Sequence, residues 1–239
     1  SIFEHRSSTS SIITQDQASS YPLDISQKRK QDRSQPLLKE TMLILSSSTI
    51  GRTAAHQARR KVDGLLRSMS IAAGTDLTSS SATWQKARPW YNDDSEGSNV
   101  ASDNAVTMSD LFKGRKVAVF GIPAPFTGVC THAHVPPYKE LASEFKARGV
   151  DEVVCYSVAD PYSHHNWAES MGVDPADITF LADDDCEWAK ENGLDRDYTG
   201  ASLGVRSERF SMMVEDGKVK SFNIVEDADK DAETLLEQV

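Results

Sequence analysis

The chain has 239 residues, with 26 Lys or Arg against 36 Asp or Glu, so its formal net charge is −10. This length fits one domain, or one domain with a terminal extension. The acidic balance argues against a nucleic-acid partner, and the lack of any run of 18 apolar residues argues against a membrane span. Three cysteines are too few for a disulfide scaffold and indicate a reducing compartment.

Composition divides the chain into two parts. Residues 1–100 hold 13 basic side chains, 10 acidic side chains and 19 serines. Residues 101–239 hold 13 basic side chains, 26 acidic side chains and 10 serines, together with all three cysteines. A serine-rich segment of this kind buries too little apolar surface to offset its chain entropy. We therefore predict a disordered extension over residues 1–105 and a compact domain over residues 106–239.

Residues 42–90 carry seven basic and two acidic side chains, interleaved with serine and aliphatic residues. A segment rich in Ser and Arg and poor in acids is typical of an organellar transit peptide, although an ordinary disordered extension has the same composition. On the first interpretation the protein is mitochondrial or plastidial, and on the second it is cytoplasmic.

Hydrophobic patterning from residue 106 onward predicts alternating strands and helices. A buried strand (116–122), an amphipathic helix (137–148) that Gly149 ends, and a second strand (153–158) form a βαβ unit, so the two strands should be parallel. The later expected elements are a helix around 164–171, a strand at 178–181, a helix at 185–192, strands at 210–214 and 219–224 joined by an Asp216-Gly217 turn, and a helix at 229–239. This order predicts an α/β domain of three layers with a mixed sheet.

The junction between the first strand and the first helix carries the candidate chemistry. Cys130 is expected near the N-terminus of the helix, where free N–H groups and the helix dipole stabilise a thiolate, the nucleophilic form. The dipole contributes only about 0.3–2 kcal/mol, whereas a reactive thiolate needs roughly 3.4 kcal/mol. We therefore expect a cation nearby, with the Thr127 hydroxyl aimed at the sulfur and prolines shielding the pocket from water.

The motif Pro123-x-x-x-Thr127-x-x-Cys130 resembles the active-site signature of the peroxiredoxins, which are thiol peroxidases with a thioredoxin-like fold. The continuation Cys130-x-x-x-His134-x-Pro136 is similar to the type II (type five) subfamily. Further blocks resemble that group in the same order: Ser157–Tyr162, Leu181–Asp183, Gly193–Asp195, Leu203–Met212 and Asp216–Gly217. The resemblance covers about residues 106–239.

The resemblance implies that Cys130 reduces hydrogen peroxide and organic hydroperoxides in antioxidant defence and redox homeostasis, without a metal or organic cofactor. Arg209 matches the family's active-site arginine and would supply the expected cation, with Thr127 and Pro123 completing the catalytic set. His134, Phe126 and Gly128 are candidate pocket residues. Arg206 either supports Arg209 or is merely solvated.

The reduction of the oxidised cysteine has two possible routes. Cys155 stands where many type II members carry a second cysteine, so it could resolve Cys130 as an internal disulfide; as a mid-strand residue it could equally be a buried hydrophobe. In the latter case glutathione with glutaredoxin, or thioredoxin, reduces Cys130 directly. Cys186 is expected to be structural.

Two alternative interpretations and two differences from the family's usual sequence remain to be considered. Cys130, His132 and His134 do not share one helix face, so their spacing does not favour a metal site. A redox sensor or chaperone-type relay would use the same cysteine with little turnover. The family usually has a proline at the position of Gly128, and its N-terminal β-hairpin is not recognisable before Val106. Type II members imply a monomer or homodimer.

Overall fold

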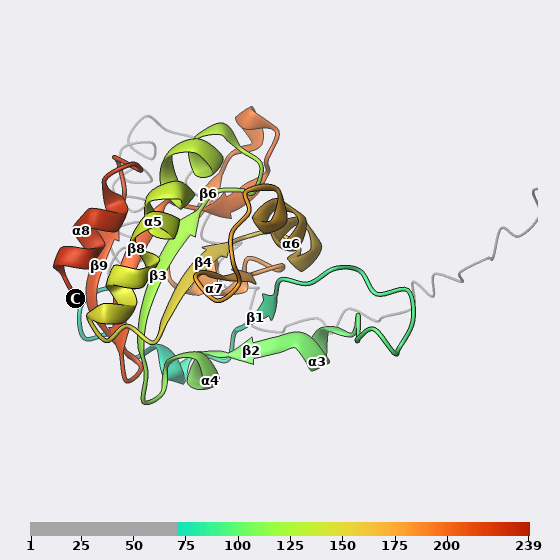
Figure 1. Ribbon diagram of the computed structural model, residues 1–239, viewed down its shortest axis with the longest axis horizontal. Helices are drawn as coiled ribbons and strands as arrows, with labels where there is room; N and C mark the ends of the chain where they lie inside the picture. Colours follow the sequence, from blue (N-terminus) through green and yellow to red (C-terminus); the bar gives the residue numbers. More distant parts are fainter. Residues whose placement is uncertain (1–70) are drawn as a thin grey trace, which may run out of the picture. The chain divides into compact units, whose positions relative to one another are not determined.

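The computed structural model describes residues 71–239, which form a seven-stranded mixed sheet with helices on both faces (Figure 1). The strand order is β2-β1-β5-β4-β3-β8-β9. The strands are β1 Thr83–Lys86, β2 Ala105–Thr107, β3 Lys116–Ile122, β4 Glu152–Ser157, β5 Thr179–Ala182, β8 Phe210–Glu215 and β9 Lys218–Ile224, and a separate pair consists of β6 Asp195–Asp197 and β7 Val205–Ser207. The α-helices are α3 Ala101–Asn104, α4 Met108–Phe112, α5 Val135–Ala147, α6 Pro161–Ser170, α7 Glu187–Glu191 and α8 Asp231–Glu237, with the short helical turns η2 Leu77–Ser79, η3 Cys130–His134 and η4 Thr199–Ala201.

The predicted βαβ unit is confirmed. β3 and β4 are parallel, with Val119 opposite Val154, and α5 connects them. β5 adds a third parallel strand beside β4, whereas β8 and β9 are antiparallel on the other side of β3. The Asp216-Gly217 turn joins β8 to β9 as predicted, and both residues have the positive φ that such a tight turn requires.

The expected domain boundary at residue 105/106 is wrong, because it falls inside β2. β1 pairs with β2 on one side and with β5 on the other, so this antiparallel pair extends the sheet. Leu77 and Trp84 are buried, with at most 2% of their surface exposed. A transit peptide extending to residue 90, as the composition suggested, would remove β1; residues 1–70, which hold the rest of that prediction, lie outside the described residues.

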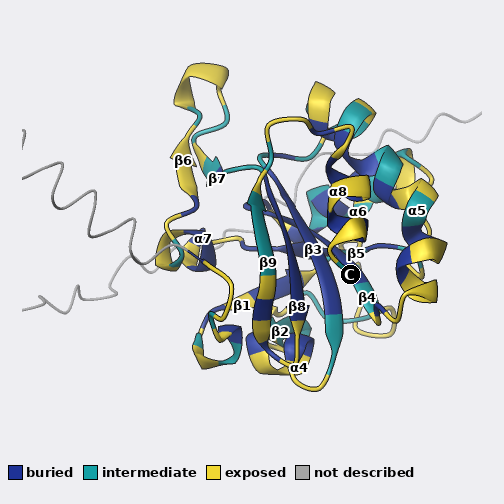
Figure 2. Cartoon of the chain, turned by 90° about the vertical axis from the view of Figure 1, so that its left-hand side faces the viewer, coloured by how far each residue is buried: buried dark blue, intermediate teal, exposed yellow. Residues whose placement is uncertain are grey.

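Alternating side chains of the strands build two apolar cores, one on each face of the sheet. Val154 and Tyr156 of β4 point to the face covered by α4 and α7, where Trp84 and Trp188 meet at ring centroids 5.0 Å apart. Val153 and Cys155 point to the opposite face, which α5, α6 and α8 cover. Figure 2 shows the buried strands between these helices. Cys130 belongs to the second core, so the candidate nucleophile lies on the α5 face.

Gly121 in β3 marks a close approach between neighbouring strands. A Cβ atom placed on Gly121 would lie 2.1 Å from the Phe210 ring of β8, so no other residue fits there without displacing that ring. Phe210 directly follows Arg209, and this contact therefore helps to fix where the arginine enters the sheet.

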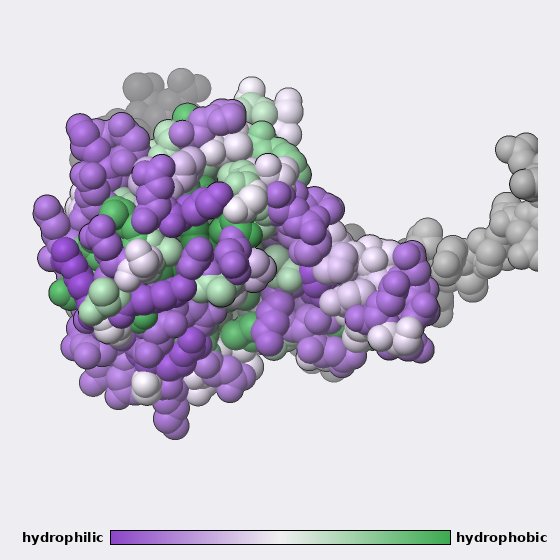
Figure 3. All heavy atoms as spheres, viewed as in Figure 1, coloured by the Kyte–Doolittle hydropathy of each residue, from purple (hydrophilic) through white to green (hydrophobic). Residues whose placement is uncertain are grey.

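The outer surface is mostly hydrophilic on the face that Figure 3 presents, where hydrophobic residues form small patches. Among residues 71–239 no helix is long and apolar enough to cross a membrane.

Candidate functional site

Cys130 opens the turn that leads into α5, as the sequence predicts. The turn η3 (Cys130–His134) is π-helical: the N–H of Val135 donates to the Cys130 carbonyl five residues earlier. Two prolines, Pro136 and Pro137, follow at the start of α5 and have no N–H with which to bond the preceding carbonyls. Helical backbone begins at residue 128, ahead of the predicted start at residue 137, and the wide π-helical turn carries the cysteine.

Arg209 supplies a cation at the sulfur. Its guanidinium Nη2 donates to the Cys130 Sγ atom at 3.4 Å. Arg209 immediately precedes β8, and its own carbonyl accepts from the N–H of Val225 at the end of β9. Since β8 pairs antiparallel with β3, the start of β8 lies beside the end of β3, and this places the arginine next to the helix that follows β3.

His134 lies between Arg209 and a buried carboxylate. Its Nδ1 accepts from the Arg209 Nη1 at 2.8 Å, because a guanidinium can only donate. Its Nε2 lies 2.9 Å from the Oδ2 of Asp231. Because Nδ1 accepts from the guanidinium, the ring carries its proton on Nε2, which faces the carboxylate. Burial, opposed by Asp231 and reinforced by Arg209, lowers the pKa of His134 and favours this neutral form.

Sequence reasoning missed Asp231. It lies among Asp227 and Asp229 at the start of the last helix, which in the sequence resembles an ordinary solvated acidic cluster, yet only 4% of its surface is exposed. No local pattern could identify it, because its partner His134 is separated from it by 97 positions.

Thr127 and the surrounding loop differ in detail from the expectation. The Thr127 hydroxyl donates to the Ala124 carbonyl at 2.9 Å, so in this structure its proton is not directed at the sulfur. Pro123 is half-buried at the end of β3, consistent with a pocket wall. Phe126 is 59% exposed with a φ of +58°, which places its ring outside the packed core. Gly128 lies in open space with no positive φ, so nothing here requires a glycine.

The other two cysteines lie on opposite faces of the sheet. Cys155 is fully buried in the centre of β4, opposite Phe120 and Phe180, and burial raises the pKa of its thiol well above the usual range. It shares the α5-face core with Cys130. Cys186 lies in the other core, at the start of α7, where burial also raises its pKa.

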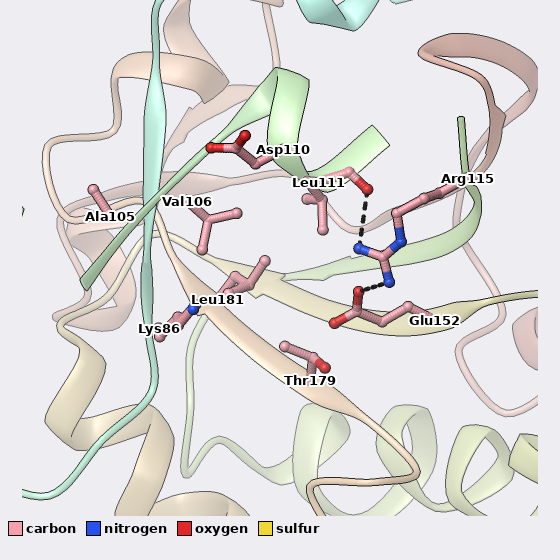
Figure 4. A pocket seen from close by; sticks show the side chains of 9 residues that line it. All are labelled: Lys86, Ala105, Val106, Asp110, Leu111, Arg115, Glu152, Thr179 and Leu181. Atoms are coloured by element: carbon pink, nitrogen blue, oxygen red, sulfur yellow. Dashed lines mark hydrogen bonds and ion pairs between the residues drawn. The ribbon is translucent and has the colours of Figure 1, made fainter. Parts of the chain in front are cut away.

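A separate hollow of about 420 Å³ lies at the opposite, amino-terminal end of the parallel strands. Its polar lining includes Arg115, which pairs with Glu152 at 2.5 Å and also donates to the Leu111 carbonyl (Figure 4). None of the three cysteines lines it. Within residues 71–239 no group of three or more His, Cys, Asp or Glu side chains is arranged to hold a metal ion.

Comparisons with known proteins identify the family of the chain. The Redoxin family model matches residues 93–236. The chain is 45% identical over 208 residues to "Peroxiredoxin-2F, mitochondrial" of Arabidopsis thaliana, covering 83% of this chain and 98% of that one, and 42% identical to the protein of that name in Oryza sativa subsp. japonica, covering 82% and 98%. These alignments extend into residues 1–105, beyond the region 106–239 over which the motifs carry the resemblance.

Solved structures show the same fold. Reduced Prx3 of Vibrio vulnificus in complex with hydrogen peroxide matches with a TM-score of 0.59 at 31% identity, covering 71% of this chain and 99% of that one. Peroxiredoxin 5 of Alvinella pompejana matches with a TM-score of 0.57 at 25% identity, covering 70% and 98%. The thioredoxin-like fold expected from the motifs is thereby confirmed. The chain belongs to the peroxiredoxins, within the Redoxin family and the type II subfamily, and is a thiol-dependent peroxidase.

Proposed function

We propose that Cys130 is the peroxidatic residue. Its thiolate attacks the terminal oxygen of a hydroperoxide, an S–O bond forms as the O–O bond breaks, and the leaving oxygen takes a proton to become water or an alcohol. The sulfur is left as a sulfenic acid. The observation that carries this proposal is the contact of 3.4 Å from the Arg209 Nη2 to the Cys130 Sγ at the first turn of a helix.

Arg209 acts twice in this step. It stabilises the thiolate before reaction, and its remaining N–H groups are available to the peroxide oxygen on which negative charge develops. Thr127 and Pro123 shape the pocket above the sulfur. The Thr127 oxygen, whose proton is held by the Ala124 carbonyl, is left as an acceptor for the peroxide O–H.

An external thiol reduces the sulfenic acid directly. Cys155 is fully buried mid-strand, and attack by it would require β4 to leave both β3 and β5. Cys130 lies in the first turn of a helix, where fewer hydrogen bonds must open, and the adjacent Val129 is 54% exposed. This contrast favours glutathione with glutaredoxin, or a thioredoxin-type protein, over an internal disulfide.

Intact mass spectrometry tests both proposals. After one equivalent of hydrogen peroxide, wild-type protein should gain the mass of one oxygen atom, and added glutathione should convert this into an adduct that digestion places on Cys130. Cys130→Ser should gain neither. Cys155→Ser should consume peroxide at the wild-type rate with glutathione and glutaredoxin supplied, with Cys186→Ser as the matched control. A loss of two hydrogens mapped to Cys130 and Cys155 would instead establish an internal disulfide.

We also infer that the protein functions in mitochondria. Two relatives with nearly full-length coverage are named as mitochondrial proteins, and residues 42–70 retain five of the seven basic side chains noted in the transit-like segment. The test is a fusion of residues 1–70 to a fluorescent protein in plant cells, scored against mitochondrial and plastid markers. Diffuse cytoplasmic fluorescence would contradict this inference.

A further inference from the structure

Asp231 is a buried carboxylate whose three hydrogen-bond donors come from three different elements. Its Oδ2 accepts from the Tyr138 hydroxyl at 2.6 Å and from the His134 Nε2 at 2.9 Å. Its Oδ1 accepts from the Ser211 hydroxyl at 2.6 Å. Within residues 71–239 it pairs with no Lys or Arg side chain. Burying a carboxylate in an apolar core costs free energy of folding unless hydrogen-bond donors satisfy its lone pairs. The three donors around Asp231 meet this requirement.

The His134 ring has one proton to place between two partners. Arg209 presents a donor to Nδ1, so that nitrogen must be the acceptor, and Asp231 presents an acceptor to Nε2, so that nitrogen must carry the proton. The opposite tautomer would set two N–H donors against each other at Nδ1 and two acceptors at Nε2. The carboxylate and the guanidinium therefore select the same tautomer.

The guanidinium is held at both ends. Nη1 donates to His134 at 2.8 Å and Nη2 donates to Cys130 at 3.4 Å, so one planar group spans the histidine and the sulfur. His134 itself is locked, with no exposed surface and with its ring edge-to-face against Phe120 at 5.2 Å. An arginine without the histidine acceptor would be free to rotate about its terminal bonds, and its contact with the sulfur would be occupied for less of the time.

We propose that Asp231 is a positioning residue for the peroxidase reaction: by fixing the Nε2–H tautomer of His134, it holds Arg209 against Cys130. The proposal rests on the role proposed above for Cys130. Asp231 touches neither the sulfur nor the peroxide, and it acts through an acceptor position on the histidine ring. The effect of Asp231 on the rate should therefore depend on its oxygen that accepts from the His134 Nε2–H, rather than on its negative charge.

The first test is the tautomer itself. Long-range ¹⁵N–¹H spectra of the reduced full chain with labelled histidine distinguish a protonated ring nitrogen from a bare one. We expect His134, assigned by its loss in His134→Gln, to be protonated at Nε2 and bare at Nδ1. A proton on Nδ1 would overturn the proposal. This readout does not depend on peroxide chemistry, so it stands even if Cys130→Ser showed the proposed function to be wrong.

The second test is the rate of Cys130 oxidation by hydrogen peroxide. Trp167 is the fluorescence probe that we expect to respond, since its indole N–H donates to the Thr131 hydroxyl next to the cysteine. Asp231→Leu has a similar shape and excludes water but offers no acceptor, and the rate should fall by about tenfold as His134 loses its single tautomer. Asp231→Asn can still accept through its amide oxygen, and its rate should stay within about threefold of the wild type.

The matched control is Tyr138→Phe, which removes another donor to the same Oδ2 atom but keeps the aromatic ring that packs edge-to-face on His134. It should lower stability but leave both the rate and the ¹⁵N spectrum unchanged. The proposal is overturned if a folded Asp231→Leu protein reacts within twofold of the wild type, or if Asp231→Asn is as slow as Asp231→Leu. If Asp231→Leu does not fold, the proposal is decided by the His134 tautomer of the wild-type protein: a proton on Nε2 supports it and a proton on Nδ1 overturns it.

Discussion

Replacing Arg209 with methionine is the most direct test of the electrostatic argument at Cys130. Methionine keeps much of the apolar stem but removes the guanidinium that donates to the sulfur at 3.4 Å. At that separation, with an effective dielectric constant of about 20, the Coulomb attraction between a cation and a thiolate is about 5 kcal/mol. Part of it is offset by desolvation, and charge-assisted hydrogen bonds contribute about 1.5–3 kcal/mol net.

A loss of about 2–3 kcal/mol in the transition state corresponds to a rate roughly 30- to 160-fold lower. The assay is the second-order rate constant for oxidation by hydrogen peroxide at pH 7, followed by stopped-flow fluorescence. Arg209→Lys restores the charge but cannot reach His134 and Cys130 together, so its rate should lie between those of the wild type and the methionine variant.

Arg206→Met is the control for net charge. Arg206 lies three positions earlier, and its guanidinium donates to the backbone carbonyls of Val158 and Leu203 rather than to the sulfur. Its loss should change the rate by less than about threefold, as expected for a charge screened by solvent and salt. A rate for Arg209→Met within twofold of the wild type would refute the view that this arginine activates Cys130.

Three further predictions concern stability. A chain of residues 71–239 should fold and reduce peroxide. A chain of residues 106–239 lacks β1 and the buried Trp84, so it should show no cooperative unfolding transition in urea. A cooperative transition of the shorter chain would mean that β1 is dispensable. Gly128→Pro should raise the free energy of unfolding by about 0.4–1 kcal/mol, because the glycine has no positive φ and stands at the first helical residue, where the N–H has no partner within the helix and proline is favoured. A loss of stability would show that this N–H is needed. Burial lowers the pKa of His164 to about 3, so below pH 6.5 the unfolded chain binds a proton that the folded chain does not, and stability should fall as the pH falls. Between pH 6.5 and 5 this costs up to about 2 kcal/mol, which urea unfolding of the wild type against His164→Leu would measure; equal losses in both would contradict the assignment.

The parts of this fold that could be predicted are those in which neighbouring residues carry the information. The βαβ unit, the hairpin around Asp216-Gly217 and the final helix all follow from periodicity and turn chemistry within short windows. The position of Cys130 near a helix start followed from the same reasoning, because it lies in the short segment between a predicted strand and a predicted helix.

The pair β1–β2 could not be predicted in this way. The two strands have four and three residues, they are separated by residues 87–104, and β1 is stabilised by pairing with β5 nearly a hundred positions later. Strands of three or four residues are too short for hydrophobic alternation to identify them, and the role of their apolar side chains is evident only from their packing in the folded core.

The sequence by itself indicated a reactive cysteine at Cys130 that needs a nearby cation, and the resemblance of its motifs to the peroxiredoxin signature implied the reaction and matched Arg209 to that cation. Only the tertiary structure decided how the reactive group is held. The hydrogen-bond chain joins Asp231 of α8, His134 of η3 and Arg209, which precedes β8. Whether each His134 nitrogen donates or accepts is set by the group that faces it. A buried hydrogen-bond chain of this kind depends on distances of a few ångströms between residues far apart in the sequence, which no local pattern encodes.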